Sequence, residues 1–160
     1  MLALPDAAAL NRVLAEHEFT RRYRFHVRDV GPGVCEMLVP YLPEHDRPGG
    51  VVSGQVYMHA ADVAFWLAVK SLLGLEQEYV TSSMTTAFLA SARAQEFICR
   101  ARVIKPGRRL IFGDAECRAG DRVFTHHTIT YVAAGRPPDH GPPAPSSSQD
   151  PATIPVANQD

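Results

Sequence analysis

The sequence predicts an α+β domain in which an antiparallel sheet is wrapped around one long buried helix. One apolar segment of helical length, residues 53–73, follows two short strand-like segments. After it the hydrophobic period changes to two and stays so through about four further strand-like segments. One long helix between two groups of strands is typical of α+β folds, and 160 residues suit one domain with a sizeable core.

The N-terminal part predicts a short helix and a hairpin. Helix-forming residues occupy 7–17, directly after Pro5-Asp6. Two segments rich in β-branched and aromatic residues then flank the turn Gly31-Pro32-Gly33. The following segment, "YLPEHDRPGG", is polar and predicts a loop.

The central helix is expected to begin at Ser53 and to run to about Leu73. Serine is a favoured N-cap residue, and Gly74 suits the position after a helix C-terminus.

Four strands are expected after the helix, at residues 79–90, 96–105, 110–118 and 122–134, arranged as a meander. Turn residues separate the last three, at 106–109 and 119–121. Alternation in the first of these strands places one set of side chains on a common face: Val80, Ser82, Met84, Thr86 and Phe88.

Composition divides the chain into a domain, residues 1–134, and a tail, residues 135–160. The tail is rich in proline and serine and has no aromatic residue, so it is expected to be disordered. The net charge of −1 does not favour nucleic-acid binding. The N-terminus lacks a basic region typical of signal peptides, and the apolar run 56–69 is short for a membrane span. We expect a soluble cytoplasmic protein that binds no membrane.

The three cysteines, Cys35, Cys99 and Cys117, are widely spaced and odd in number, which argues against a disulfide framework or a cysteine zinc site. They lie on predicted strands and are expected to be reduced core residues. Adjacent strand residues face opposite ways, so His126 and His127 are poorly placed to share a metal. No metal and no cofactor are expected.

Asp62 interrupts the apolar helix. An unpaired carboxylate is costly in apolar surroundings, so Asp62 must be hydrogen-bonded, paired or protonated. It is either a functional carboxylate or a structural residue bonded to a neighbouring loop or arginine. His59, one turn earlier, either tunes Asp62 or is a structural histidine with its own partner.

The same helix favours a homo-oligomer. A helix that is apolar on every side is expected to be buried on every side, whereas one sheet covers only one face. The second cover is either a partner subunit or another layer of the same chain, for which the N-terminal helix looks small.

The helix start is a second candidate site, because the first-turn N–H groups are unpaired and favour negative charge. Gly54 and Asp62 are eight residues apart, which is about 12 Å of helical rise. The two cannot act on one small group within a subunit, so the helix start and Asp62 would have to come from different subunits.

These residues resemble the hotdog-fold acyl-CoA thioesterases of the phenylacetate-pathway (PaaI-like) group. That group has His-Gly-Gly, six residues and then Asp; here Ser53-Gly54-Gln55, "VYMHAA" and Asp62 have the same spacing. The segments "RPGGVVSG", "VTSSMTTAFL" and "RARVIKPGRRLIFGDAEC" also follow the group, and the resemblance covers about residues 20–134. It implies a hotdog fold, dimers whose sheets join, often paired into homotetramers, and sites at subunit interfaces.

The resemblance also implies a reaction, hydrolysis of a medium-chain or aromatic acyl-CoA to free acid and CoA. Asp62 would act as general base or nucleophile, and the N–H groups of Gly54 and Gln55 would form the oxyanion hole. Thr81 would place a hydroxyl near the attacking water. Apolar candidates for the acyl pocket are Met58, Phe65, Trp66 and Phe88.

The chain departs from the group at three positions: Ser53 replaces the histidine, Gln55 the second glycine, and Arg47 an upstream asparagine. We interpret "SGQ" as the signature of a subgroup, with Ser53 as a substrate contact. The alternatives are an acyl-CoA-binding protein without catalysis and a hydratase of enoyl or hydroxyacyl thioesters; the latter requires a histidine paired with a carboxylate at the helix start.

Arginines are the candidates for binding the CoA phosphates. Arg108 and Arg109 follow Lys105-Pro106-Gly107 at a predicted hairpin turn, which in the related group lies near the nucleotide. The alternative is an ordinary solvated turn. Arg47 and Arg93 are weaker candidates for the same role.

Overall fold

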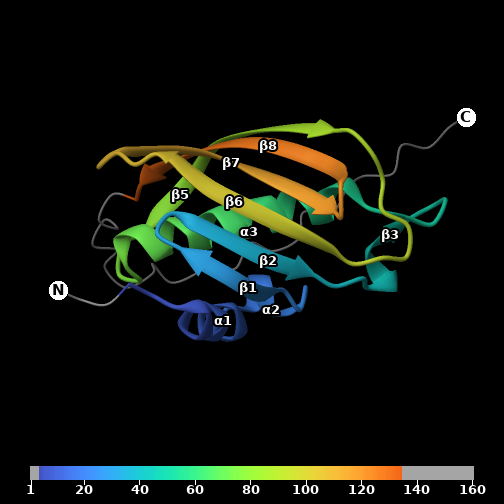
Figure 1. The fold of residues 1–160 in the computed structure, drawn as a ribbon, viewed down its shortest axis with the longest axis horizontal. Helices are drawn as coiled ribbons and strands as arrows, with labels where there is room; N and C mark the ends of the chain where they lie inside the picture. The colour runs from blue at the N-terminus through green and yellow to red at the C-terminus, as the bar shows by residue number, and fades with distance from the viewer. Residues whose placement is uncertain (1–3, 135–160) are drawn as a thin grey trace, which may run out of the picture.

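The computed structural model describes residues 4–134 and has a six-stranded antiparallel sheet curled around one long helix, α3 (Gly54–Leu73) (Figure 1). This is the hotdog fold, and it confirms the predicted fold class. The sheet strands are β1 (His26–Gly31), β2 (Val34–Val39), β5 (Tyr79–Phe88), β6 (Phe97–Lys105), β7 (Leu110–Ala119) and β8 (Arg122–Ala133). The tail predicted at 135–160 lies outside the described residues.

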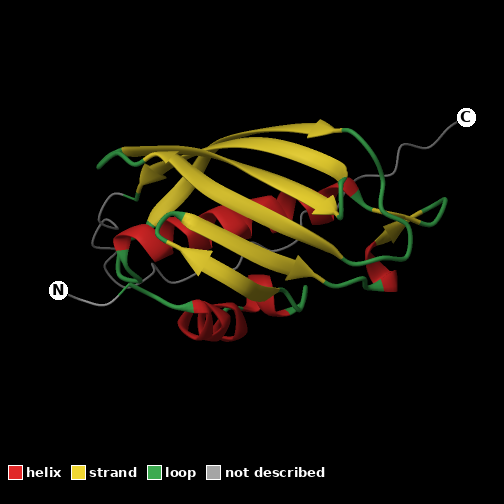
Figure 2. Ribbon diagram, in the orientation of Figure 1, coloured by secondary structure: helices red, strands yellow, loops and turns green. Residues whose placement is uncertain are grey.

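The strand order is β1-β2-β6-β7-β8-β5. Figure 2 shows these strands in yellow, curved around the long red helix α3. Only β6, β7 and β8 form the expected meander. The expectation that β5 continues it was wrong, because β5 pairs with β8 at one edge while β6 pairs with β2. A register shift between Thr81 and Ser83 also breaks the strict alternation predicted for β5.

The N-terminal part is as predicted, with additions. Helix α1 (Ala7–Glu16) begins at Asp6, whose carboxylate accepts a hydrogen bond from Ala9 N–H, and it packs against β1. The β1–β2 turn contains Gly33 at φ +74°, a conformation that favours glycine. The short helix α2 (Glu18–Arg21) was not predicted. The predicted loop 41–50 contains the 3₁₀ helix η1 (Pro43–His45) and part of a small ribbon, β3 (Asp46–Arg47) with β4 (Val51–Val52).

Helix α3 begins and ends where the sequence predicts. Its N-cap residue is Ser53, as expected. The Ser53 side chain makes no capping hydrogen bond, however, so the position was predicted correctly and the side-chain interaction was not. At the C-terminus, Gly74 has φ +92° and its N–H donates to the Lys70 carbonyl at 2.9 Å.

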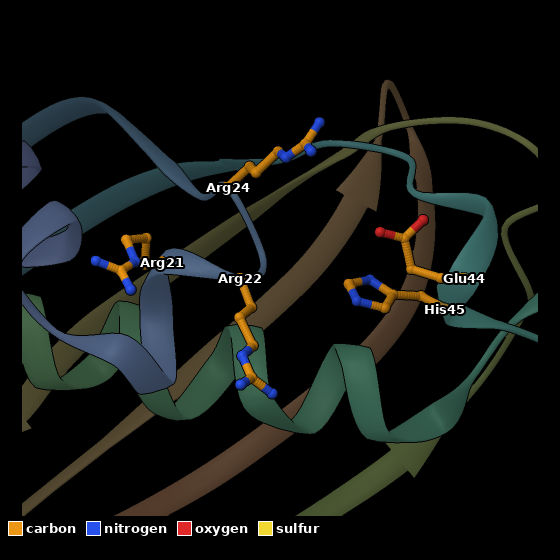
Figure 3. A pocket seen from close by; sticks show the side chains of 5 residues that line it. All are labelled: Arg21, Arg22, Arg24, Glu44 and His45. Carbon is orange, nitrogen blue, oxygen red and sulfur yellow. The ribbon is translucent and has the colours of Figure 1, made fainter.

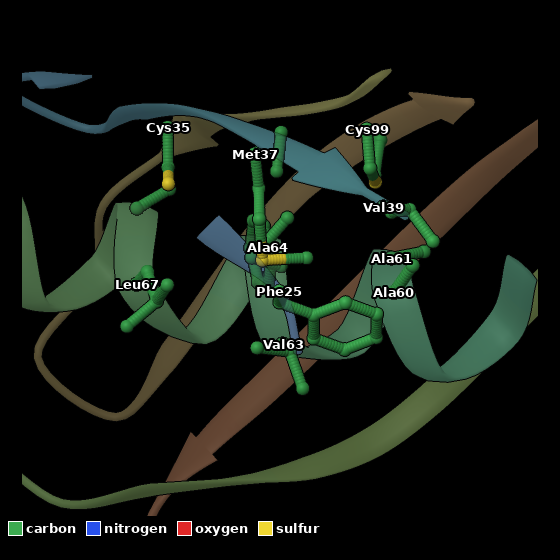
Figure 4. Packing of buried hydrophobic residues seen from close by; sticks show 14 of the residues in the cluster. Phe25, Cys35, Met37, Val39, Ala60, Ala61, Val63, Ala64, Leu67 and Cys99 are labelled. Carbon is green, nitrogen blue, oxygen red and sulfur yellow. The ribbon is translucent and has the colours of Figure 1, made fainter. Parts of the chain in front are cut away.

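The core lies between the concave face of the sheet and α3 (Figure 4). Small residues on α3, including Ala60, Ala61 and Ala64, let it approach β2 and β6 closely. The three cysteines are fully buried, which confirms their place in the core. Burial raises the pKa of the Cys35 thiol to about 12, and the nearby Asp29 and Glu36 charges add to this effect.

One stripe of α3 is not covered by the sheet, and it consists of Gln55, Met58, His59, Asp62 and Trp66. Residues before β1 cover part of it: the Phe19 ring contacts those of Trp66 and His59. Part of the second cover therefore comes from the same chain, the alternative that the sequence left open, and Phe19 lies just after the N-terminal helix predicted at 7–17. Met58 remains 41% exposed.

Within the described chain, α3 is the one helix that is long and apolar enough to cross a bilayer, with 20 residues. The sequence argument that the apolar run 56–69 is short for a membrane span does not hold for the whole helix, which is longer. Its most apolar window is 67% buried inside the fold, as in a core helix.

Candidate active site

The Asp62 carboxylate is held by two hydroxyl groups from the edge of the sheet. Thr81 on β5 donates to Asp62 Oδ1 at 2.7 Å, and the Tyr131 hydroxyl on β8 lies 2.9 Å from the same oxygen. The Tyr131 hydroxyl also lies 2.9 Å from the Asp62 carbonyl oxygen. Of the three states that the sequence allowed for Asp62, hydrogen-bonded, paired or protonated, the structure shows the first.

Tyr131 was not predicted as a site residue. Burial raises its pKa, and the adjacent Asp62 charge raises it further, so its hydroxyl stays protonated and can donate. It is directly opposite Thr81 in the β5–β8 register. The alternation of β8 puts Tyr131 on the buried face, but only the β5–β8 pairing, which the sequence pattern did not provide, brings it to Asp62.

Asp62 faces a cavity of about 410 Å³. Its walls are mostly apolar and aromatic, and the residues that line it are His17, Phe19, Asp62, Val63, Trp66, Glu78, Tyr79, Val80, Thr81 and Tyr131. Asp62 Oδ2 has no hydrogen-bond partner among residues 4–134. The cavity therefore combines an apolar wall with a carboxylate oxygen that is free to accept a proton.

The four acyl-pocket candidates occupy different places. Trp66 lines the Asp62 cavity. Phe65 is fully buried and contacts Tyr131 edge-on, so within the protomer it is a core residue and does not line the cavity. Met58 is exposed on α3, and Phe88 is 56% exposed at the end of β5.

The helix start is open and lies against Phe88. A β-carbon on Gly54 would come within 3.1 Å of the Phe88 ring, so glycine permits this close approach. The N–H groups of Gly54 and Gln55, in the first turn, have no partners within the helix. Gln55 is exposed and Ser53 half-buried. This group does not line the Asp62 cavity of the same protomer.

The arginine candidates are spread over the surface. Arg108 lines a cavity of about 490 Å³ with Leu73 and Gln77, and Tyr79 borders both this cavity and that of Asp62. Arg109 is exposed beside it. Arg47 lies in β3, and Arg93 donates to the Gly49 carbonyl at 2.7 Å, on the ribbon that precedes α3.

The histidines have structural surroundings. His59 Nε2 bonds to the Phe19 carbonyl at 2.9 Å, as the structural alternative predicted, and burial lowers its pKa. His126 is half-buried on the outer face near Asp114, whereas His127 is buried between Thr86 and Thr125, so the two do face opposite ways. Residues 4–134 contain no group of three or more side chains suited to hold a metal ion.

Comparisons agree with this architecture. A family model described as "Thioesterase superfamily" matches residues 49–126. A thioesterase family protein from Silicibacter pomeroyi is 25% identical, with 78% of this chain and 94% of that chain covered and a TM-score of 0.72. The conserved protein PA5202 from Pseudomonas aeruginosa is 26% identical, with coverages of 77% and 98% and a TM-score of 0.73.

The PaaI protein of the E. coli phenylacetic acid degradation operon has the same fold at 17% identity, with coverages of 81% and 94% and a TM-score of 0.72. No curated protein matches the sequence. The chain is thus similar to thioesterases over most of its described length, and its central part matches their superfamily model.

Proposed function

We propose that this protein is a member of the thioesterase superfamily that hydrolyses a medium-chain or aromatic acyl-CoA to the free acid and CoA. The observation that carries the proposal is the setting of Asp62. One carboxylate oxygen is fixed by Thr81 and Tyr131, while the other is free beside an aromatic cavity. A carboxylate fixed in this way can accept a proton from water as the water attacks a bound thioester.

In this reaction water adds to the carbonyl carbon and Asp62 takes its proton. The resulting oxyanion would be stabilised by the Gly54 and Gln55 N–H groups. The carbon–sulfur bond then breaks, and the proton goes to the departing thiolate. The other route to the same products is direct attack by Asp62 on the carbonyl carbon. The carbon–sulfur bond breaks, CoA leaves as a thiolate that takes up a proton, and water hydrolyses the resulting anhydride.

The site would be composite, with Asp62 from one protomer and the helix start from another. Two features of the described chain support this. Gly54 and Asp62 are separated by about 12 Å of helical rise. In addition, β5 forms a sheet edge without a partner strand among residues 4–134, and it carries exposed apolar residues such as Val80 and Phe88. An open apolar edge favours pairing with a second copy.

We propose that two β5 edges pair to form a homodimer, that dimers associate into homotetramers, and that the protein acts in the cytoplasm. The β1 edge is a poorer candidate for this pairing because α1 packs against it.

The test is a panel of acyl-CoAs with aliphatic and aromatic acyl groups, in which thiol release is followed with a chromogenic disulfide. We expect release by the native protein, and a loss of about 10²–10⁴-fold in kcat for Asp62→Asn. The matched control is Asp121→Asn, which makes the same change at an exposed carboxylate in the β7–β8 turn and should leave kcat unchanged.

Other outcomes would contradict the proposal. Tight CoA binding without thiol release from any substrate would favour a binding protein. That alternative is considered because Ser53 and Gln55 replace residues of the group's His-Gly-Gly motif. Hydration of an enoyl-CoA without thiol release would favour a hydratase. Full activity in Asp62→Asn would exclude Asp62 as the catalytic carboxylate.

A further inference from the structure

A third cavity, of about 470 Å³, is lined mainly by cationic side chains from two segments (Figure 3). We call it the arginine cavity, and it consists of Arg21, Arg22, Arg24, Glu44 and His45. The arginines come from the end of α2 and the turn after it. Glu44 and His45 come from η1 on the opposite side.

The arginine cavity carries an excess of positive charge. Its lining contains three arginines and a single carboxylate, that of Glu44. Glu18, outside the lining, contacts both Arg21 and Arg22, and each guanidinium keeps further N–H donors. Arg24 makes no ion pair within residues 4–134. This donor-rich surface suits phosphate, which guanidinium binds through paired hydrogen bonds.

The backbone conformation of Arg24 would favour glycine, which indicates that the arginine side chain is needed at this position. Arg24 has φ +54°, the left-handed region, and its N–H donates to the Arg21 carbonyl at 3.2 Å. This conformation is unfavourable for a residue with a β-carbon, whereas glycine adopts it readily. An arginine is held here despite that cost, and its side chain borders the cavity.

The arginine cavity is attached to the start of α3. The His45 carbonyl accepts a hydrogen bond from the N-cap residue Ser53 at 3.0 Å. The Tyr23 ring, between Arg22 and Arg24 in the sequence, contacts the ring of His45 at 4.8 Å and that of His59 at 4.2 Å. These contacts fix both walls of the cavity to the first two turns of the helix, close to the proposed oxyanion donors.

We propose that the arginine cavity binds phosphate groups, and that in the enzyme these are the phosphates of the CoA nucleotide. The second part rests on the proposed function. Figure 3 shows the three guanidinium groups pointing in different directions, which suits a ligand with separated phosphates better than a single small ion. CoA carries a diphosphate and a separate 3′-phosphate on its ribose. This proposal gives the arginine cavity the role that the sequence suggested for Arg108 and Arg109, which the structure does not test.

The experiment compares an acyl-CoA with the matching acyl-pantetheine, which has the same thioester but no nucleotide. The variant combines Arg22→Ala with Arg24→Gly, since glycine adopts the Arg24 conformation without strain. Arg12→Ala, on the exposed side of α1, is the control. We expect the double variant to raise KM for the acyl-CoA about tenfold or more, without changing KM for the acyl-pantetheine. Circular dichroism and thermal unfolding check the fold of each variant.

Binding of adenosine 3′,5′-bisphosphate, measured by calorimetry, tests the arginine cavity without any hydrolysis. Bisphosphate binding to the native protein and to Arg12→Ala, with loss of binding in the double variant, supports a phosphate site. This holds even if neither thioester is cleaved, because the absence of cleavage would refute only the proposed function. Bisphosphate binding that is lost in the variant while KM for acyl-CoA is unchanged would overturn the assignment to CoA and indicate a separate phosphorylated ligand. Equal KM changes for both thioesters, or bisphosphate binding that the variant does not weaken, would overturn the phosphate site.

Discussion

Removal of one hydroxyl group, in Tyr131→Phe, tests how Asp62 is positioned. Tyr131 is 2% exposed, and its ring contacts the Phe65 ring edge-on at a centroid distance of 4.9 Å, a contact that phenylalanine would retain. The substitution therefore removes mainly the hydroxyl's contacts with Asp62, at Oδ1 and at the carbonyl oxygen. A hydrogen bond to a charged group contributes about 1.5–3 kcal/mol. If that bond orients the carboxylate in the transition state, its loss lowers kcat/KM by roughly 10- to 150-fold.

The matched control is Tyr57→Phe. The Tyr57 hydroxyl accepts a hydrogen bond from Ala92 N–H at 2.8 Å, and its ring is stacked on Phe97, away from Asp62. Both substitutions are expected to lower the melting temperature, but only Tyr131→Phe should lower kcat/KM. Steady-state hydrolysis and thermal unfolding measure the two effects. Native kcat/KM in Tyr131→Phe, or an equal loss in Tyr57→Phe, would refute the positioning role.

Two further predictions concern the scaffold. The β-carbon added in Gly113→Ala would overlap the Arg102 carbonyl oxygen and the Phe65 ring. We therefore expect the free energy of unfolding, measured by chemical denaturation, to fall by about 3 kcal/mol or more. Unchanged stability would show that β7 does not lie so close to α3. Burial lowers the pKa of His59, against opposing effects of the Phe19 carbonyl and Asp62, while His45 adds to the lowering. Its contribution to stability is therefore present above its unfolded value of 6.5 and is lost as the pH falls through the lowered value. His59→Gln keeps a donor for Phe19 but does not titrate, so its unfolding free energy should fall less than that of the native protein between about pH 7 and 5; identical pH dependences would contradict this assignment.

Local patterns were sufficient for most of the fold. The bounds of α3 follow from an apolar segment between Ser53 and Gly74, and the hairpins follow from their turn residues. The place of β5 could not be predicted in this way, because its pairing with β8 joins residues far apart in the chain.

The same limit applies to the site. Asp62 was predictable because a carboxylate in an apolar helix needs a partner. Its partner Tyr131 depends on the β5–β8 register, and the arginine cavity depends on the approach of η1 to the end of α2. Phe65 lies in the core of the protomer, and helical spacing alone does not tell whether a neighbour of Asp62 faces the cavity or the core.

The central claim, a catalytic site shared between protomers, is tested most directly by mixing two inactive variants. One is Asp62→Asn, and the other is Gln55→Pro, which removes a proposed oxyanion donor. After denaturation and joint refolding of equal amounts, about half of the dimers would be mixed, and each would have one intact site. We therefore predict recovery of about one quarter of the native activity, from variants that are inactive alone. No recovery, with mixed dimers shown to be present by differently tagged chains, would contradict a shared site.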